Sequence, residues 1–382
     1  MIYRYSINKG KTIKKGLALA KNKEVLFERF SNSEIINISK VFDNYESEIE
    51  FYKALRNLLF QGYNVYESID ILYRSSEYKK FNFRLKKIRE SLKKGDNFSY
   101  ALEVFTDSDI FIINYIRLAE KSGNLIASLD ECIEYMQNKI KIKEKIVSGL
   151  SYPILLLSLS LLMIVVISRS VIPIFENIFS SFNMEMPFIT RIAFFMGNIF
   201  GNYLIKILIL LIIFSIIHMF IKIKSSKYKF WVQEFKFKKS LFKNIRKEKF
   251  LSEFFKKFSL LYRQDNNLII SLENIFKTED DVYIRNELNK LLLSVKSGED
   301  LNFSNMKNLF TEYSVYSLNS IKKSRMADKV AHELSDFYFD KYIMKLNNLI
   351  RISAPIMVLF VGIFIGFIAL SVVLPMFSLN AI

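Results

Sequence analysis

Residues 118 to 173 read LAEKSGNLIASLDECIEYMQNKIKIKEKIVSGLSYPILLLSLSLLMIVVISRSVIP. After the turn signal Ser122-Gly123-Asn124, apolar residues recur at helical spacing and lead into a lysine-rich segment, 139 to 145. No charged residue follows between Ile146 and Ser168, and about twenty such residues cross a bilayer at ~1.5 Å per residue. This stretch therefore predicts one helix that begins in the cytoplasm and ends in lipid.

The composition of the chain restricts its class. Its 382 residues are 51% hydrophobic, with a net charge of +17 and a mean hydropathy of +0.17. By these values the chain is too apolar for an ordinary soluble protein and too highly charged for a permease with many spans. The lone Cys132 excludes an internal disulfide and a cysteine-based zinc cluster. The N-terminal sequence MIYRYSINKGKTIKK has no apolar region, so we expect no cleaved signal peptide.

The pattern along the chain predicts an all-α integral membrane protein with three transmembrane helices and two cytoplasmic helical bundles. Basic residues flank each apolar run on one side, which by the positive-inside rule makes the N-terminus cytoplasmic and the C-terminus external. The expected segments are a hairpin-like N-terminal appendage (1–45), a first bundle (46–149), a first span (150–168), an external loop (169–198), a second span (199–221), a basic linker (222–244), a second bundle (245–348) and a third span (352–377).

Two short motifs could suggest chemistry, but each has a simpler interpretation. Gly10-Lys11-Thr12 matches the last three residues of the phosphate-binding-loop motif. Tyr5, however, occupies the position of the first glycine of that motif, so we favour a turn. Asp107 and Asp109 could be metal ligands, but acidic residues at a helix start are ordinary N-caps, which we favour. No nucleophile elbow is present, and His218 and His332 lack metal-ligand spacing, so we expect neither an enzyme nor a cofactor or metal site.

An internal repeat is the most informative feature of the sequence. A shift of about 203 residues superimposes the first bundle on the second. With a small local slip, Tyr152-Pro153 also matches Ala354-Pro355, so we expect each copy to be a bundle whose last helix enters the membrane. The matched pairs are Phe51 with Phe254, Leu55 with Phe258, Leu58 with Leu261, Val65 with Leu268, Ser68 with Ser271, Ile69 with Leu272 and Gly95 with Gly298.

Several short motifs in this order resemble those of the type II secretion F-type inner-membrane platform proteins, which include the PilC-like proteins of type IV pilus and competence systems. The resemblance covers nearly the whole chain. Ala119 departs from the family pattern, and so does the second copy, which reads SRMADKV from Ser324 to Val330 where the glutamate and glycine motif should recur. The residues that carry the resemblance are Leu58-Leu59 with Gly62 and Val65, Gly95, Glu120 with Ser122-Gly123 and Leu125, Tyr152-Pro153, Ile172 to Phe175, Pro187 with Thr190, and Leu374 to Phe377.

The resemblance implies a platform that links a separate cytoplasmic hexameric ATPase to the extraction and polymerisation of pilin or pseudopilin helices. Other inner-membrane assembly proteins and further copies of the chain would also be its partners. Separately, the basic residues beside the apolar runs predict attraction to anionic lipid, and we do not expect nucleic acid as a partner. Gly62, Gly95, Glu120, Ser122, Gly123 and Leu125 are then the candidate motif residues. Prolines free backbone carbonyls and permit bending, so the candidate membrane hinges are Pro153, Pro173, Pro187, Pro355 and Pro375.

Glu120 also has a physical interpretation that does not depend on the resemblance. It lies in the last turn of its helix, where the negative end of the dipole disfavours a carboxylate. We expect it to accept backbone N–H bonds from the helix that starts after Gly123, or to pair with a lysine; a contact to a partner or a cation is the alternative. Gly123 is expected to be the left-handed residue that ends the helix.

Two other functions stay open at this stage. A subunit of a small-solute transporter would place charged or polar groups at mid-membrane, whereas the polar residues within these spans are mostly serines, Ser158, Ser160 and Ser215. A membrane-anchored nucleic-acid-binding protein would use the basic helices and the abundant aromatic residues, but these aromatics fall mostly on apolar helical faces.

Overall fold

The computed structural model describes residues 2–9, 12–19, 34–40, 45–75, 81–106, 108–181, 188–299, 301, 306–321, 324 and 326–379. Contacts divide the chain into two compact units. The first comprises Met1–Ile142 and Lys249–Phe339, and the second comprises Lys143–Glu248 and Asp340–Ile382. The first unit contains both helical bundles, and the second contains the apolar helices.

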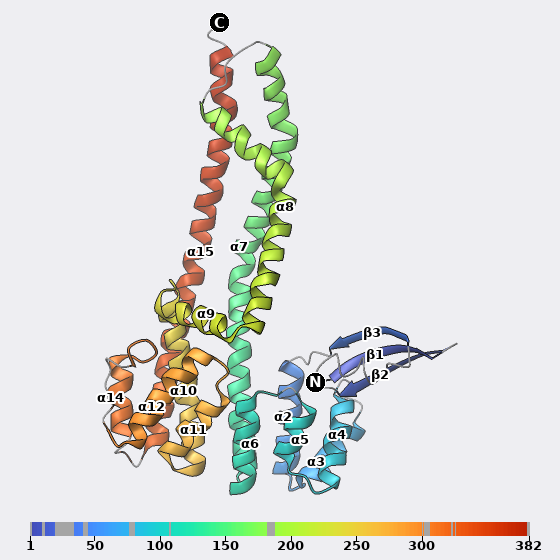
Figure 1. Cartoon of the computed structure of the whole chain (residues 1–382), viewed down its shortest axis with the longest axis vertical. Coiled ribbons are helices and arrows are strands. Elements are labelled where there is room, and N and C mark those ends of the chain that lie inside the picture. Colours follow the sequence, from blue (N-terminus) through green and yellow to red (C-terminus); the bar gives the residue numbers. More distant parts are fainter. Residues whose placement is uncertain are drawn as a thin grey trace. The chain divides into compact units, whose positions relative to one another are not determined.

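The N-terminal residues form a small antiparallel sheet of three strands in the order β2-β1-β3 (Figure 1). β1 (Ile2–Lys9) pairs with β2 (Thr12–Leu19) along its whole length, and β3 (Glu34–Lys40) pairs with the other edge of β1. The predicted hairpin is therefore present, and the third strand was not predicted. Gly10 and Lys11 lie outside the described residues. Beyond this sheet, the rest of the described chain is helical, as predicted.

The first bundle consists of α2 (Tyr45–Phe60), α3 (Val65–Arg74), α4 (Asn82–Lys93), α5 (Phe98–Phe105), α6 (Ile110–Ser122) and the first turns of α7 (Leu125–Ser181). From α2 to α6, each helix packs on the next in sequence (Figure 1). Asn64 begins α3 with a reciprocal capping box to Glu67, and Asp109 caps α6 by accepting from the Phe111 N–H at 2.9 Å. The N-cap interpretation is thus confirmed for Asp109; Asp107 lies outside the described residues.

The second bundle consists of α10 (Lys243–Asp265), α11 (Leu268–Thr278), α12 (Val282–Lys296), α14 (Glu312–Ile321) and the start of α15 (Ala327–Leu379). From Phe250 to Leu261, α10 is buried on nearly all sides, as expected of a helix at the centre of a packed unit. The same bundle supplies a row of stacked or edge-to-face rings: Phe250, Phe254, Phe255, Phe258, Phe310 and Tyr338.

The repeat predicted from the sequence is visible in matched local structure. Ser68 and Ser271 are both completely buried. Gly95 and Gly298 both adopt positive φ, at 91° and 77°. Asn64 and Asn267 lie 203 residues apart by their numbers, and each accepts backbone N–H bonds as an N-cap. The turn that Gly62 makes at φ 97° is made in the second copy by Asn266 at φ 48°, asparagine being a residue that tolerates this region.

The second unit contains the apolar parts of α7 and α15, together with α8 (Phe188–Lys224) and α9 (Ser226–Lys238). α7 continues through Pro153 and Pro173, and α15 continues through Pro355 and Pro375. The expected external loop, 169–198, is largely helical, because α7 ends only at Ser181 and α8 begins at Phe188. Its sequence carries few charges, and a proline within an apolar helix is tolerated where neighbouring groups satisfy the freed carbonyl. Pro187 lies outside the described residues.

Two described helices are long and apolar enough to cross a membrane, Leu125–Ile174 within α7 and Ala327–Ile363 within α15. A third candidate is a bent pair, Ile209–Lys222 with Ser226–Lys238, whose axes differ by 111°. The structure therefore supports two or three spans, and the third depends on α8.

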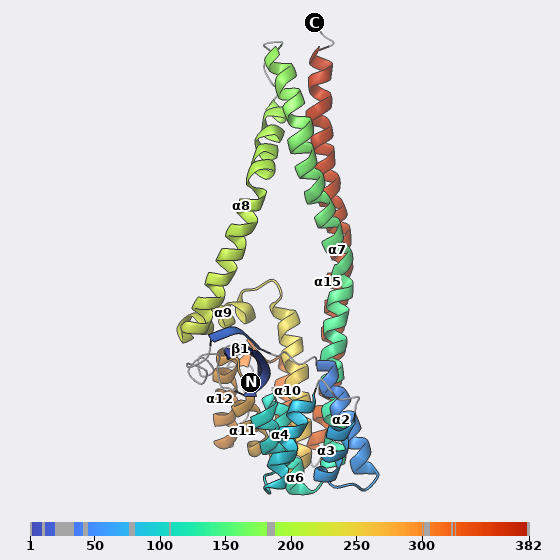
Figure 2. The same ribbon diagram turned by 90° about the vertical axis from the view of Figure 1, so that its right-hand side faces the viewer.

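α7 and α15 approach each other closely just before their prolines (Figure 2). A Cβ added to Gly149 would lie 2.6 Å from Cγ2 and 2.8 Å from Cδ1 of Ile350. Because apolar carbons pack at about 3.5–4.0 Å, only glycine permits this separation of the two helices.

Candidate functional site at the junction of the two repeats

Glu120 caps the N-terminus of α5. One carboxylate oxygen accepts from the Phe98 N–H at 2.6 Å, and the other accepts from the Ser99 N–H at 3.0 Å. Asn97, the residue at the N-cap position, makes no side-chain cap bond of its own. Glu120 therefore satisfies two donors that every helix leaves unpaired at its start, and its charge lies at the positive end of the α5 dipole.

This result corrects the expected partner of Glu120. We predicted bonds from the helix after Gly123, or a lysine, whereas the donors belong to α5. The reason is the packing of consecutive helices: α5 and α6 are joined by a short turn and pack on each other, so the last turn of α6 lies beside the first turn of α5.

The turn after α6 has the predicted geometry. Gly123 adopts φ 72°, and its N–H and that of Asn124 both donate to the Ala119 carbonyl. A left-handed residue at this position ends α6 and lets α7 begin at Leu125. Ser122 extends its hydroxyl to the side-chain oxygen of Gln264 at 2.8 Å, so this motif contacts the second copy directly.

In the second copy, the position equivalent to the start of α5 is stabilised by a neutral side chain. Leu301 lies 203 residues after Phe98, and its N–H donates to Asn319 Oδ1 at 2.9 Å. The Asn319 amide in turn donates to the Leu301 carbonyl at 3.1 Å. Asn319 belongs to α14, as Glu120 belongs to α6. The backbone N–H at this position is therefore bonded in both copies, to the carboxylate of Glu120 in the first and to the amide of Asn319 in the second.

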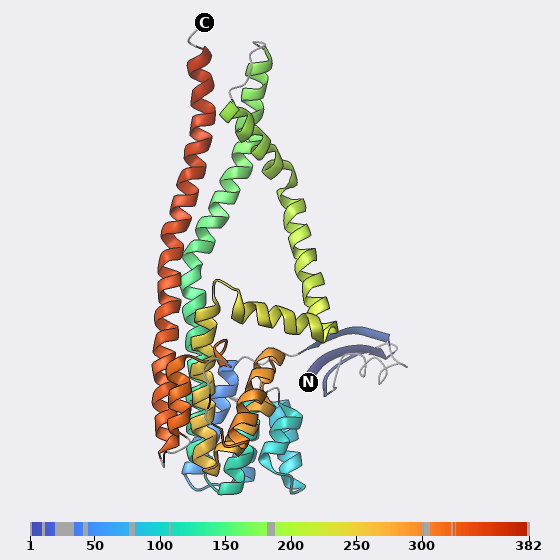
Figure 3. The same ribbon diagram turned by 60° about the vertical axis from the view of Figure 1, so that its left-hand side comes forward.

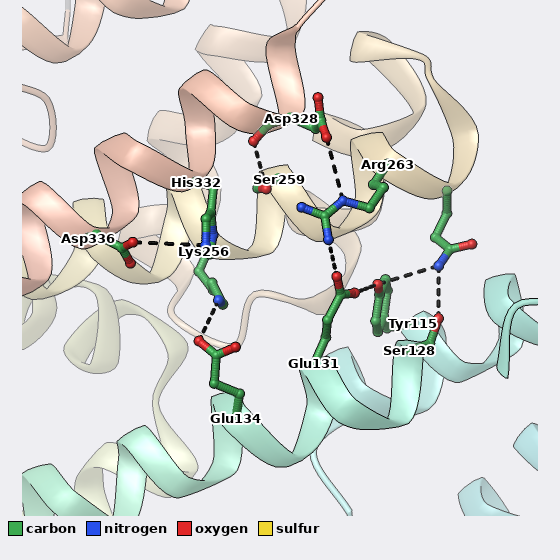
Figure 4. Close-up of polar contacts among 11 residues, drawn as sticks. Tyr115, Ser128, Glu131, Glu134, Lys256, Ser259, Arg263, Asp328, His332 and Asp336 are labelled. Atoms are coloured by element: carbon green, nitrogen blue, oxygen red, sulfur yellow. Dashed lines mark hydrogen bonds and ion pairs between the residues drawn. The ribbon is translucent and has the colours of Figure 1, made fainter. Parts of the chain in front are cut away.

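Acidic groups of the first copy meet basic groups of the second where α7 faces α10 (Figure 4). Arg263 forms an ion pair with Glu131, and the Tyr115 hydroxyl donates to the same carboxylate. Burial raises the pKa of Tyr115 well above its usual range, and the hydrogen bond to Glu131 raises it further. The phenol therefore stays protonated and remains a donor to Glu131.

A second pair continues the same junction. Lys256, whose side chain is only 9% exposed, donates to Glu134 at 2.8 Å. Glu131 and Glu134 are three residues apart on α7 and so lie on one face of that helix. Lys256 and Arg263 are seven apart on α10, which places them on one face as well. The pairing is thus complementary along two helices from different copies.

The divergent motif of the second copy also reaches this junction. Asp328, in the first turn of α15, lies 3.5 Å from the Arg263 guanidinium and accepts the Ser259 hydroxyl at its backbone carbonyl at 2.8 Å. Gln264 next to Arg263 donates to Ser128 on α7 at 2.8 Å. Both copies of the motif therefore contribute to one polar cluster, which we call the junction cluster: Tyr115, Ser122, Ser128, Glu131, Glu134, Lys256, Arg263, Gln264 and Asp328.

Sequence reasoning found some members of this site and missed others. Glu120, Ser122, Gly123 and Leu125 are brought together at the α6–α7 turn, as the motif suggests, whereas Gly62 and Gly95 serve other turns of the first bundle. The ion pairs that join the copies in the junction cluster were not predicted. An available signal was the spacing of two acids on α7 and two bases on α10, although such spacing also fits an ordinary solvated face.

Within the described ranges, no group of three or more histidine, cysteine, aspartate or glutamate residues could hold a metal ion. His218 bonds to the Tyr228 hydroxyl at 2.8 Å, and His332 lies 3.9 Å from Asp336 within one helix. The site is therefore one of helix caps and ion pairs, a chemistry suited to packing and coupling helices.

Two helical repeats, each ending in an apolar helix long enough to cross a membrane, define an integral membrane protein with an internal repeat. The profile of the type II secretion system protein F family matches the chain twice, at residues 51–173 and 254–375. The chain belongs to this family, and the two matches coincide with the two copies of the repeat.

Relatives with similarity over most of the chain include three bacterial assembly or transport proteins. The type IV pilus assembly protein PilC of Thermus thermophilus is 22% identical over 331 residues, covering 86% of this chain and 81% of that protein. PilC of Pseudomonas aeruginosa is 18% identical, covering 86% and 89%. The protein transport protein HofC homolog of Escherichia coli is 20% identical, covering 88% and 84%.

Replacing Glu120 by alanine is expected to destabilise the first bundle by about 1–2 kcal/mol, the usual cost of losing a helix cap. Glu120→Gln should cost less, because the amide keeps one accepting oxygen while the other backbone donor loses its partner. The measurement is the thermal unfolding of the purified chain. Asn319→Ala provides the matched control in the second copy. A Glu120→Ala protein as stable as wild type would show that the cap has no energetic role.

Proposed function

We propose that this chain is the inner-membrane assembly platform of a type IV pilus or type II secretion-like machine. It couples a separate cytoplasmic ATPase to the extraction and polymerisation of pilin-like subunits. The observation that carries this proposal is the double family match, whose two segments each run from a helical bundle into an apolar helix. The family consists of platform proteins rather than enzymes, which agrees with a role in positioning and force transfer.

The mechanism we propose is mechanical. The bundles engage the ATPase, and their displacement passes along α7 and α15 into the membrane, where the prolines act as points of bending. The junction cluster supports this role, because it joins the two bundles through defined contacts, and the Glu120 cap fixes α5 against α6 within the first bundle. The pilin or pseudopilin helix, other assembly proteins and further copies of the chain would be the membrane partners.

The hydrogen bonds of the serine hydroxyls on α7 argue against a solute transporter. Ser158 donates to the Leu155 carbonyl at 2.8 Å, and Ser160 donates to the Leu157 carbonyl at 2.9 Å. These hydroxyls are satisfied within their own helix, whereas a solute pathway needs polar groups that face one another across helices.

The test of the proposed function is photo-crosslinking in cells. A photoreactive residue placed at Leu162 of α7 or Leu359 of α15, both exposed apolar positions, should crosslink to a pilin-like protein. The same probe at Lys53 in the first bundle should not. Deletion of the gene should abolish pilus or secretion output. Crosslinks to no pilin-like protein, with normal output from the deletion strain, would contradict the proposal.

Membrane orientation gives a further expected result. A reporter fused after Asn380 should be translocated, whereas one placed after Lys239 should stay cytoplasmic, because basic residues follow α8 immediately. The Lys239 fusion decides whether α8 is a span. If α8 did not cross the membrane, the site after Lys239 would lie on the external side. Two reporters on the same side would disprove the arrangement of three spans.

A further inference from the structure

α9 begins where the apolar α8 ends, and it turns sharply away from it (Figure 3). The bend between Ile209–Lys222 and Ser226–Lys238 is 111°. Ser225 makes the break: its N–H still bonds to Ile221, and its hydroxyl caps α9 by accepting from the Tyr228 N–H at 3.3 Å. A helix at this angle to a span lies close to the plane of the membrane surface.

One face of α9 carries an aromatic stripe, formed by the half-buried Tyr228 and the exposed Trp231 and Phe235. Their spacing of three and four residues places them on one side of the helix. Ring centroids are 6.3 Å apart between Tyr228 and Trp231 and 6.2 Å apart between Trp231 and Phe235. Trp231 is 61% exposed and Phe235 is 47% exposed, while Val232 beside the stripe and Gln233 on the opposite side of the helix are buried. Apolar rings of this size are rarely left in water without a partner.

The first residue of the stripe, Tyr228, contacts α8. The Tyr228 hydroxyl bonds to His218 Nδ1 on α8 at 2.8 Å, and the two rings meet edge to face at 5.6 Å. His218 lies on the apolar side of the bend, before Lys222. The first ring of the stripe is therefore held against the helix that leads toward the bilayer.

The charge around the stripe matches an anionic surface. Residues 222 to 243 contain eight lysines and one acidic residue, Glu234. Glu234 is itself paired with Lys238 at 2.5 Å. Lys227 and Lys238 are exposed and border the aromatic stripe on one side by helical geometry. Long lysine side chains can bury their stems at the interface and place the ammonium among headgroups.

We propose that α9 is an interfacial helix, whose stripe of Tyr228, Trp231 and Phe235 inserts into the headgroup region of the cytoplasmic leaflet while its lysines bind anionic phospholipids. Tryptophan and tyrosine favour this depth, and basic helices are drawn to anionic lipid. The inference rests on the proposed orientation of α8 in the membrane. It makes α9 a lipid-bound segment that follows the second apolar helix in the chain and precedes the second bundle.

Trp231 is the only tryptophan in the chain, so its emission reports on α9 alone. The full chain is reconstituted into vesicles of phosphatidylcholine and phosphatidylglycerol. We expect blue-shifted emission and a loss of most intensity when the lipids carry bromine near the top of the acyl chain. Bromine near the bilayer centre, or aqueous acrylamide, should quench less.

The anionic preference is tested with trace brominated lipid of each class. Brominated phosphatidylglycerol should quench Trp231 more than brominated phosphatidylcholine does. In the double variant Lys227→Gln with Lys238→Gln, the quenching by the two lipid classes should become more nearly equal. Lys53→Gln with Lys121→Gln, which removes the same charge from the first bundle, should leave the difference intact. No ATPase or pilin is present in this assay, so it can fail while the platform function holds.

Three outcomes would overturn the proposal. Full quenching by acrylamide without quenching by brominated lipid would place the stripe in water. Protection from both quenchers would show that protein covers it. Equal quenching by the two lipid classes in the wild-type chain would show that the lysines select no anionic lipid.

Discussion

Replacing Arg263 by alanine is expected to destabilise the packing of the two repeats by about 1–3 kcal/mol. The substitution removes the cation that pairs with Glu131, whose side chain is only 18% exposed. It also removes the group beside Asp328 on α15. Most of the cost comes from leaving the Glu131 carboxylate partly buried with the Tyr115 hydroxyl as its remaining partner. The measurement is thermal unfolding of the purified chain by circular dichroism, with hydrogen exchange along α10 to locate the effect.

Arg56→Ala is the matched control, because Arg56 pairs with Asp130, the neighbour of Glu131 on α7, within the first copy. That pair is more exposed, at 30% and 49%, so its loss should cost only about 0–1 kcal/mol. Adding Glu131→Gln to Arg263→Ala should recover part of the loss, since it removes the unpaired charge. Equal effects of Arg263→Ala and Arg56→Ala, or no recovery in the double variant, would show that the junction cluster contributes no more than a surface pair.

The sequence predicts those features that depend on short stretches of chain. Gly123 ends α6 in the left-handed region as expected, because the requirement for φ > 0 is local and favours glycine. The repeat could be found because buried positions such as Ser68 and Ser271 keep their residue type. The helical content followed from apolar spacing, apart from the third N-terminal strand and the helical parts of the 169–198 segment.

Features that depend on how helices pack could not be predicted in the same way. Glu120 was expected to need a compensating partner, yet its donors on α5 are set by the packing of α5 on α6. Arg263 and Gln264 resemble the solvated face of an amphipathic helix until α7 is placed against α10. The need for glycine at position 149 is also invisible in the sequence, because Ile350, the residue that requires it, is about 200 positions away.

The asymmetry between the copies has a physical consequence for the proposed function. The first copy holds its turn with the charged Glu120, and the second holds the equivalent turn with the neutral Asn319. A carboxylate at a helix start can also attract a cationic side chain of a partner, whereas an amide cannot do so through charge. If a partner engages one of these turns, we therefore expect it to be the turn of the first copy. Glu120→Gln should then lower pilus or secretion output more than Asn319→Ala does at equal protein abundance.

Replacing Gly149 by alanine is expected to separate α7 from α15 and to destabilise the helix pair by about 1–3 kcal/mol. The new methyl group would meet Ile350 at 2.6 Å and 2.8 Å, well inside contact distance. Isoleucine is β-branched and holds one preferred side-chain conformation in a helix, so it cannot turn away cheaply. The helices must then shift apart at the point where both enter their apolar segments. Thermal unfolding in detergent measures the loss, and pilus or secretion output measures its functional effect.

Two glycines of α15 give the control for this experiment. Among the described residues beyond their own helical turns, no atom lies within 4 Å of a Cβ added to Gly362 or Gly366, so alanine there should be neutral or slightly stabilising. The decisive variant is Gly149→Ala combined with Ile350→Ala, which removes the clash from the opposite side. If close packing is the reason for glycine at 149, the double variant should be more stable than the sum of the two single losses predicts. Additive losses, or a Gly149→Ala protein as stable as Gly362→Ala, would show that α7 and α15 do not depend on this contact.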